Sequence, residues 1–64
     1  MEQIGKKLKT LRLRHSLTTR QLAEYLETTN SQISRIENGL RQPSGDLIVK
    51  MADFFNIPLD KLMR

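Results

Sequence analysis

The sequence predicts an all-α domain of five helices, organised around two short helices that a tight turn connects. Apolar residues recur at the three- and four-residue spacing of helices, and no stretch alternates apolar and polar residues as strands do. The helix-start pattern Thr-x-x-Gln occurs at Thr18–Gln21 and again, eleven residues later, at Thr29–Gln32. In such a capping box the hydroxyl accepts a backbone N–H and the Gln side chain returns to the N–H of the cap residue. Two boxes at this distance predict a helix-turn-helix.

Length and composition limit what the chain can be. Its 64 residues are expected to form one domain, 1–64, with a small core and no room for an ordinary catalytic cleft. The absence of cysteine excludes disulfides and thiolate metal sites. No run approaches the roughly 18 consecutive apolar residues of a membrane span, and no signal peptide follows the start. We therefore expect no membrane partner and a cytoplasmic location.

The positive charge is unevenly distributed along the chain. Residues 1–41 contain eight Lys and Arg against four Asp and Glu, whereas residues 42–64 contain three of each. The net charge of +4 therefore lies entirely on the part that contains the helix pair. This asymmetry favours a polyanionic partner, although charge alone is equally compatible with a basic, soluble surface.

A first helix is expected at 3–14. Ile4, Leu8 and Leu11 recur at the spacing of one buried helix face, and Arg12 lies at the edge of that face. His15 falls on the same side, where we expect a half-buried structural residue. The rest of this helix presents a strongly positive surface formed by Lys6, Lys7, Lys9 and Arg14.

The second helix is expected at 19–26. Its inward face consists of Leu22, Ala23 and Leu26, with Tyr25 beside them, and the small Ala23 would let another helix approach closely. Glu27 stands where helices often end in a left-handed glycine. That conformation costs a residue with a side chain roughly 1–2 kcal/mol, so the turn is expected to be strained.

The third helix, expected at 30–38, has an unusually polar outer face. Ile33 and Ile36 are its strong inward residues, and Gly39 can supply the left-handed residue that stops it. Asn and Ser are mediocre helix formers, which disfavours an ordinary solvated face but does not exclude it. Asn can bond adenine and Arg can bond guanine through two hydrogen bonds each, and Ser can serve either base. This pattern therefore predicts that the outer face contacts the edges of DNA bases. The residues on or beside this face are Asn30, Ser31, Gln32, Ser34 and Arg35.

The last two helices are expected at 45–55 and 59–63, separated by a break at Pro58, which lacks the N–H that a helix interior needs. Ser44 caps the fourth helix, whose broad apolar stripe is the largest hydrophobic contribution in the chain.

The end of the chain is more apolar than a terminus needs. Its apolar residues either close the core or form a contact patch for a second copy, and we expect a mixture of both for Ile57, Leu59, Leu62 and Met63.

The residues offer no catalytic constellation. His15 is the sole histidine, no two carboxylates stand at the helical spacing i, i+4, and Gly5, Gly39 and Gly45 stand alone rather than in a phosphate loop. We therefore expect neither an enzyme nor a metal, cofactor or small-molecule site.

Several segments together resemble the lambda-repressor-like DNA-binding domains of the Cro/C1 (XRE) type. They are IGKKLKTLR, LTTRQLAEYL, TTNSQISRIENG, PSGDLIVKMADFFNI and PLDKL, in that order, and ISRIENG is the most specific of them. The resemblance implies a compact five-helix domain whose third helix lies in the major groove of double-stranded DNA. It also implies a homodimer on a near-palindromic operator with half-sites about one helical turn apart.

The same resemblance implies roles for individual residues. The base-reading residues would be Asn30, Ser31 and Arg35, with Gln32 as a weaker candidate. The phosphate-contacting residues would be Thr18, Thr19, Arg20, Thr29, Asn38 and Arg41. Arg12 and Glu37 match a partly buried ion pair that fixes the third helix against the first. Two positions depart from the family pattern, because Thr19 replaces a common Gln and Glu27 replaces a common Gly.

Two functions from different classes follow. The leading one is a sequence-specific transcriptional regulator, expected to be a repressor in a bacterial or phage cytoplasm. The alternative is a protein-interaction module of the antitoxin or anti-repressor type that keeps the fold but reads little DNA. The polar third helix and the basic first half favour DNA, whereas the alternative would use the apolar residues on the surface.

Overall fold

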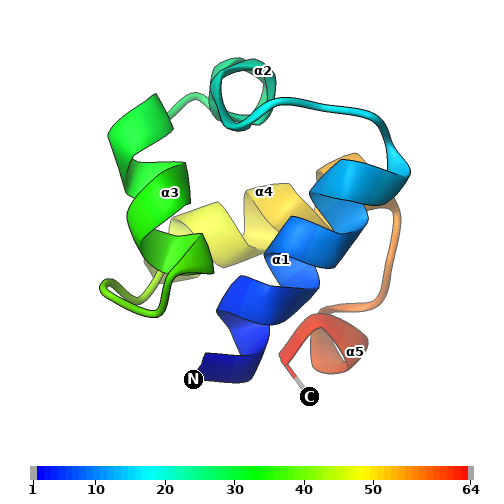
Figure 1. Cartoon of the computed structure of the whole chain (residues 1–64). Coiled ribbons are helices and arrows are strands. Elements are labelled where there is room, and N and C mark those ends of the chain that lie inside the picture. The colour runs from blue at the N-terminus through cyan, green and yellow to red at the C-terminus, as the bar shows by residue number, and fades with distance from the viewer. Residues whose placement is uncertain (1, 64) are drawn as a thin grey trace.

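The computed structural model describes residues 2–63 of the chain and the side chains of residues 4–63. Its five helices are α1 (Glu2–Arg14), α2 (Thr19–Tyr25), α3 (Asn30–Glu37), α4 (Gly45–Phe55) and α5 (Leu59–Met63). These bounds differ from the expected ones by at most one residue at any end. The all-α, five-helix class is confirmed (Figure 1).

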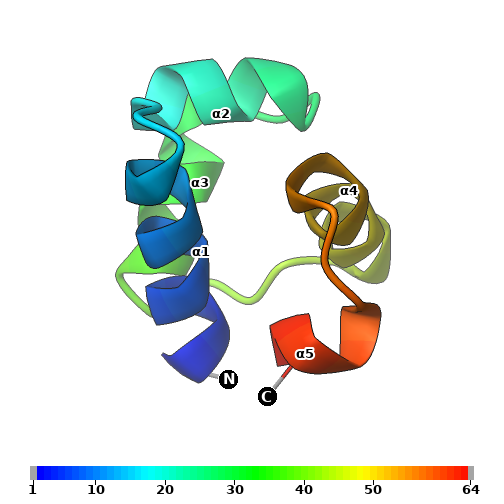
Figure 2. The ribbon, with the colours of Figure 1, turned by 90° about the vertical axis from the view of Figure 1, so that its right-hand side faces the viewer.

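The helices enclose one small apolar core. In the view of Figure 2, α1 and α3 lie on one side, α4 and α5 on the other, and α2 crosses above them. Helices α2 and α3 pack against each other, and α1 packs on both α3 and α5. Every helix contributes to the core, whose fully buried side chains are Leu8, Leu22, Leu26, Ile33, Ile36, Met51 and Leu62.

The two predicted capping boxes differ in the structure. At the first, Gln21 N–H donates to Thr18 Oγ1 at 3.0 Å and Thr18 N–H donates to Gln21 Oε1 at 2.9 Å, so the box is complete. At the second, Gln32 N–H donates to Thr29 Oγ1 at 3.1 Å, but no return bond from the Thr29 N–H to Gln32 occurs among the described residues. The prediction of a second complete box was wrong. The half-buried Gln32 side chain lies instead in a polar cleft with Arg41, beside the α3–α4 loop.

Helix α1 approaches α3 most closely at Gly5. A Cβ atom added to this buried glycine would lie 2.2 Å from the carbonyl oxygen of Ile36. Because that distance is far below van der Waals contact, only a residue without a side chain fits between the two helices here. The backbone of α3 thus rests directly on α1 one residue before Glu37.

The turn between α2 and α3 is strained as predicted. Glu27 has a φ of 57°, in the left-handed region. Its carboxylate lies 3.2 Å from Lys50 Nζ on α4, but both side chains are substantially exposed, so this pair offsets little of the strain. The glycine that follows α3 also has the expected conformation, since Gly39 has a φ of 74°.

Three expectations about burial require correction. Leu62 is fully buried in the core and is not available as a surface contact, because α5 turns this side chain inward, against α1 and α4. Tyr25, expected beside the inward face of α2, is instead 62% exposed, and its ring stacks on Phe54 at a centroid distance of 4.9 Å. His15 is exposed rather than half-buried because it follows the last residue of α1, although its ring contacts Phe55 edge-on at 5.0 Å.

Candidate nucleic-acid interface

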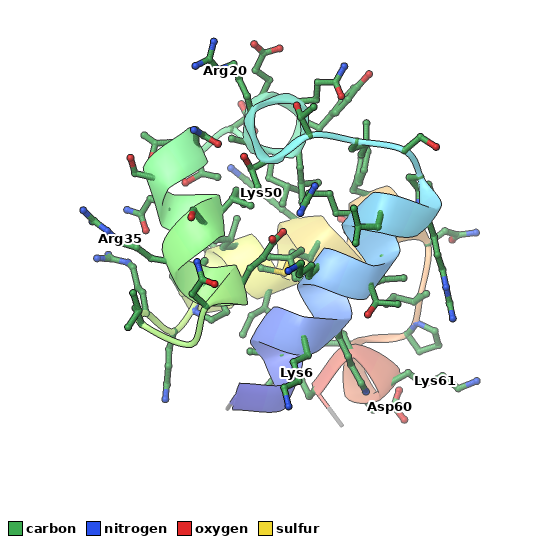
Figure 3. All side chains as sticks on the ribbon, in the orientation of Figure 1. Lys6, Arg20, Arg35, Lys50, Asp60 and Lys61 are labelled. Atoms are coloured by element: carbon green, nitrogen blue, oxygen red, sulfur yellow. The ribbon has the colours of Figure 1, made fainter. Side chains whose placement is uncertain are left out.

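The outer face of α3 is a continuous polar surface. Asn30, Ser31 and Arg35 are exposed, and Gln32 and Ser34 are half-buried beside them. The amphipathic pattern that buries Ile33 and Ile36 on the opposite side aims these groups outward. Figure 3 shows Arg35 extending from α3, and Arg20 extending from the start of α2, away from the body of the protein. The two cations therefore lie on the outer side of the helix pair.

The first residues of α2 and α3 are joined by a hydrogen bond. The Thr19 hydroxyl donates to the Asn30 side-chain oxygen, linking two helices that are adjacent in the motif. This contact leaves the Asn30 amide NH₂ group directed away from Thr19. Thr19, whose short side chain departs from the family pattern, thus contacts a neighbouring side chain within the motif.

The remaining predicted phosphate-contacting residues surround α3. Thr18 caps the N-terminus of α2, and Thr29 caps the N-terminus of α3. Arg20 and Arg41 are exposed. Asn38 caps the C-terminal end of α3, where its Nδ2 donates to the Ser34 carbonyl oxygen at 2.9 Å. The same amide nitrogen also donates, at 3.5 Å, to the Ser34 hydroxyl oxygen, so a phosphate would have to replace this longer hydrogen bond.

A single guanidinium fixes three segments of the motif. Arg12 of α1 forms two hydrogen bonds with Glu37 of α3, from Nε to Oε2 at 2.6 Å and from Nη2 to Oε1 at 3.0 Å. Its Nη1 donates to the carbonyl oxygen of Leu17, just before α2, at 2.7 Å. The side chains of Arg12 and Glu37 are only 10% and 5% exposed, so this two-pronged pair is well shielded from water. The predicted pairing of Arg12 with Glu37 is present.

Other chemistry finds no support in the described part of the chain. Residues 2–63 contain no group of three or more His, Cys, Asp or Glu side chains that could hold a metal ion. Across the same residues, no helix has the length and apolar character needed to cross a membrane. The exposed, polar and basic face of the α2–α3 pair is therefore the principal candidate site.

Comparison with known proteins identifies the motif. A family described as helix-turn-helix matches residues 8–62. This chain belongs to the helix-turn-helix family. It is 44% identical over 64 residues to the HTH-type transcriptional repressor RghR of Bacillus subtilis (strain 168), a match that covers 98% of this chain and 47% of RghR. The chain thus spans about half the length of this curated relative. RghR is named as a transcriptional repressor and the matching family as helix-turn-helix, in agreement with the expectation that the chain is not an enzyme.

Two solved helix-turn-helix proteins share its fold. Bacillus thuringiensis PlcR, crystallised with the peptide PapR7 and DNA, aligns with a TM-score of 0.86 and 33% identity over 98% of this chain and 22% of PlcR. The P22 c2 repressor, crystallised with a synthetic operator, aligns with a TM-score of 0.85 and 19% identity over 92% of this chain and 89% of that protein. The latter likeness shows a common lambda-repressor-like fold.

Two features of the site were missed from the sequence. Gly5 appeared only as an isolated glycine, although a glycine inside an amphipathic helix is itself a signal of close packing. The Thr19–Asn30 hydrogen bond had no such signal, because it depends on how the two helices cross.

Proposed function

We propose that this chain is the sequence-specific, double-stranded DNA-binding part of a transcriptional repressor, with α3 in the major groove. The observation that carries the proposal is the exposed polar row Asn30, Ser31 and Arg35 on a helix that the Arg12–Glu37 pair fixes to the scaffold. A reading helix must hold its side chains in register with base edges, and both features serve that purpose. The DNA in the PlcR and P22 c2 crystals is compatible with this assignment.

The contacts that we propose divide into reading and positioning. Arg35 reads guanine, Asn30 reads adenine, and Ser31 and Gln32 complete the base contacts. Thr19 positions Asn30, because its hydroxyl engages the amide oxygen and sets the direction of the NH₂ group. Backbone N–H groups at the start of α2 receive a phosphate, since a helix N-terminus favours an anion. The side chains assigned to phosphates are Thr18, Arg20, Thr29, Asn38 and Arg41. Thr19, whose hydroxyl proton is donated to Asn30, contributes its backbone N–H to the phosphate instead.

We propose further that the chain binds its operator as a homodimer. An apolar groove of about 390 Å³ lies between α4 and α5, lined by Gly45, Asp46, Ile48, Val49, Leu59 and Met63. Val49, Leu59 and Met63 are 50%, 47% and 42% exposed. We call these three side chains the α4–α5 patch. Packing this patch against the same patch of a second copy would cover it and generate a two-fold axis. Of the other predicted contact residues, Ile57 is half-buried against the core.

Selection from a random pool of DNA duplexes at moderate salt tests the proposal. We expect enrichment of an inverted repeat with half-sites about one helical turn apart. Enrichment of a single unrepeated site would retain the reading helix and reject the symmetric dimer.

A salt titration distinguishes the alternative function. Binding to phosphates weakens steeply with added salt because counterions are released. Failure to enrich any sequence, together with retention on DNA that does not depend on salt, would refute the DNA-binding proposal. The protein-interaction module would then be the better description, with the apolar α4–α5 patch as its contact.

A further inference from the structure

Half of the cationic side chains in the basic part of the chain are neither assigned to the proposed DNA interface nor paired with Glu37. Of the eight in residues 1–41, three belong to α2, α3 and the loop after α3, and Arg12 is paired with Glu37. In Figure 3, Lys6 lies at the end of the molecule remote from Arg20. The four cations that are neither assigned to the proposed interface nor paired with Glu37 all belong to α1: Lys6, Lys7, Lys9 and Arg14.

Most of these cations border a groove on α1, which we call the α1 groove. It has a volume of about 360 Å³ and is lined by Lys6, Lys7, Thr10, Leu11, Arg14 and Ile57. Its apolar floor consists of Leu11 and Ile57, both half-buried. The Arg14 end of the groove faces away from the reading helix, because Gly5 contacts α3 and Arg14, nine residues later, lies about half a helical turn around α1 from it. The Lys6 end adjoins the C-terminal end of α3, where Lys6 lines a cavity with Glu37, Asn38 and Gly39.

Two of the cations remain available at the ends of the apolar floor. Lys7 is already engaged, because its Nζ donates to the carbonyl oxygen of Lys61 in α5 at 2.5 Å. Lys6 and Arg14 are exposed, and neither forms an ion pair with any side chain of residues 4–63. Since an α-helix rises about 1.5 Å per residue, they are separated by about 12 Å along α1.

We propose that the α1 groove binds an acidic amphipathic helix of a partner protein. Two carboxylates at positions i and i+7 of such a helix are about 10.5 Å apart along its axis, which matches the separation of Lys6 and Arg14. Apolar residues at i+3 and i+4 then lie between the carboxylates and cover Leu11 and Ile57. Charge complementarity selects the acidic helix, and the apolar floor favours such a helix over a DNA backbone, because phosphate oxygens cannot cover Leu11 and Ile57 favourably.

A designed peptide tests this assignment directly. The probe is an acetylated and amidated 16-residue helical peptide with Glu at i and i+7 and Leu at i+3 and i+4, titrated into the ¹⁵N-labelled 64-residue chain and followed by NMR. We expect saturable shifts at Thr10, Leu11, Arg14 and Ile57, and none along the outer face of α3. Replacing both Glu by Gln is expected to weaken binding about fivefold. Replacing both Leu by Ala is expected to weaken it by about tenfold or more.

Charge reversal on the protein provides the matched control. Lys6→Glu and Arg14→Glu should each lose affinity for the peptide by about threefold or more and together by about tenfold or more, whereas Lys9→Glu, with the same charge change as either single variant, should change it by less than about twofold. Lys9 lies on the same helix with the same charge but does not line the groove. Thermal melts check that the variants remain folded. We expect that they do, because all three positions are exposed.

Three results would overturn the proposal. The first is the absence of saturable shifts up to millimolar peptide, and the second is an equal loss of affinity in Lys9→Glu. The third is a loss of DNA affinity in Lys6→Glu or Arg14→Glu that exceeds the loss in Lys9→Glu severalfold, which would assign those α1 cations to the DNA interface instead.

Discussion

Substitution of Gly5 by alanine tests how closely the reading helix is held to the scaffold. On helix propensity alone Ala would stabilise α1 by up to about 1 kcal/mol. The new Cβ, however, would lie 2.2 Å from the carbonyl oxygen of Ile36, where ordinary contact begins at 3.4 Å. The obstacle is backbone, which cannot rotate away as a side chain can. The two helices must therefore separate by about 1 Å, a gap that forfeits a quarter to a half of each dispersion contact across it.

We expect Gly5→Ala to destabilise the domain by about 2 kcal/mol. Overpacking of a well-packed site costs roughly 1–3 kcal/mol of stability. Because the obstacle here is backbone, we expect a cost of about 3 kcal/mol or more. The gain in helix propensity, up to about 1 kcal/mol, is subtracted from this cost. For a domain of this size the melting temperature should fall by roughly 10 °C. Thermal unfolding followed by circular dichroism measures the change.

The other two glycines serve as controls. Gly45 has open space around it at the start of α4, so Gly45→Ala should be neutral or slightly stabilising. Gly39 also has open space but a φ of 74°, so Gly39→Ala should cost about 1 kcal/mol through backbone strain alone. A Gly5→Ala protein that melts as high as the Gly45→Ala protein would show that the close approach imposes no constraint.

Four further predictions concern other parts of the structure. Glu37→Ala leaves a buried guanidinium unpaired and should lower the free energy of unfolding by about 3–5 kcal/mol, so an unchanged urea midpoint would contradict a structural role for the pair. Glu27→Gly removes left-handed strain and should raise the melting temperature by an amount equivalent to about 1 kcal/mol, whereas Glu27→Ala keeps the strain and should not. Arg35→Ala should leave stability unchanged and cost about 1–3 kcal/mol of base discrimination at one operator position, and a uniform loss on all sequences would mean a phosphate contact instead. Leu59→Asp should abolish self-association in sedimentation experiments, whereas Leu13→Asp, at an exposed leucine on α1, should not, and equal effects would argue against the α4–α5 patch as the dimer contact.

The sequence predicted those parts of the structure that depend on local signals. Periodic apolar residues, hydroxyl caps and the break at Pro58 placed the helices to within a residue at each end. These signals act through the backbone of the same segment and require no knowledge of the fold. The strain at Glu27 could be predicted for the same reason, because its position at a helix end determines its conformation.

Features that depend on how the helices cross could not be predicted in this way. The periodic pattern places Leu62 and Leu59 on α5, but only the packing on α1 and α4 decides that the first is buried and the second exposed. Gln32 has the sequence context of a capping box, yet its side chain lies in a cleft formed with a later loop. The Arg12–Glu37 pair joins residues 25 positions apart and was anticipated from the family resemblance rather than from spacing. The roles of the reading residues in binding DNA stay predictions.

The three hydrogen bonds of Arg12 would affect which of the two partners, the protein or the DNA, changes its shape on binding. With α1, the segment before α2 and the end of α3 tied to one guanidinium, the reading helix cannot rock independently of the rest of the domain. The protein then loses little conformational entropy when it docks, which favours affinity. Small mismatches between the two surfaces must instead be accommodated by bending or twisting of the duplex. Operators with the same contacted bases would therefore differ in affinity according to the flexibility of the base steps between them.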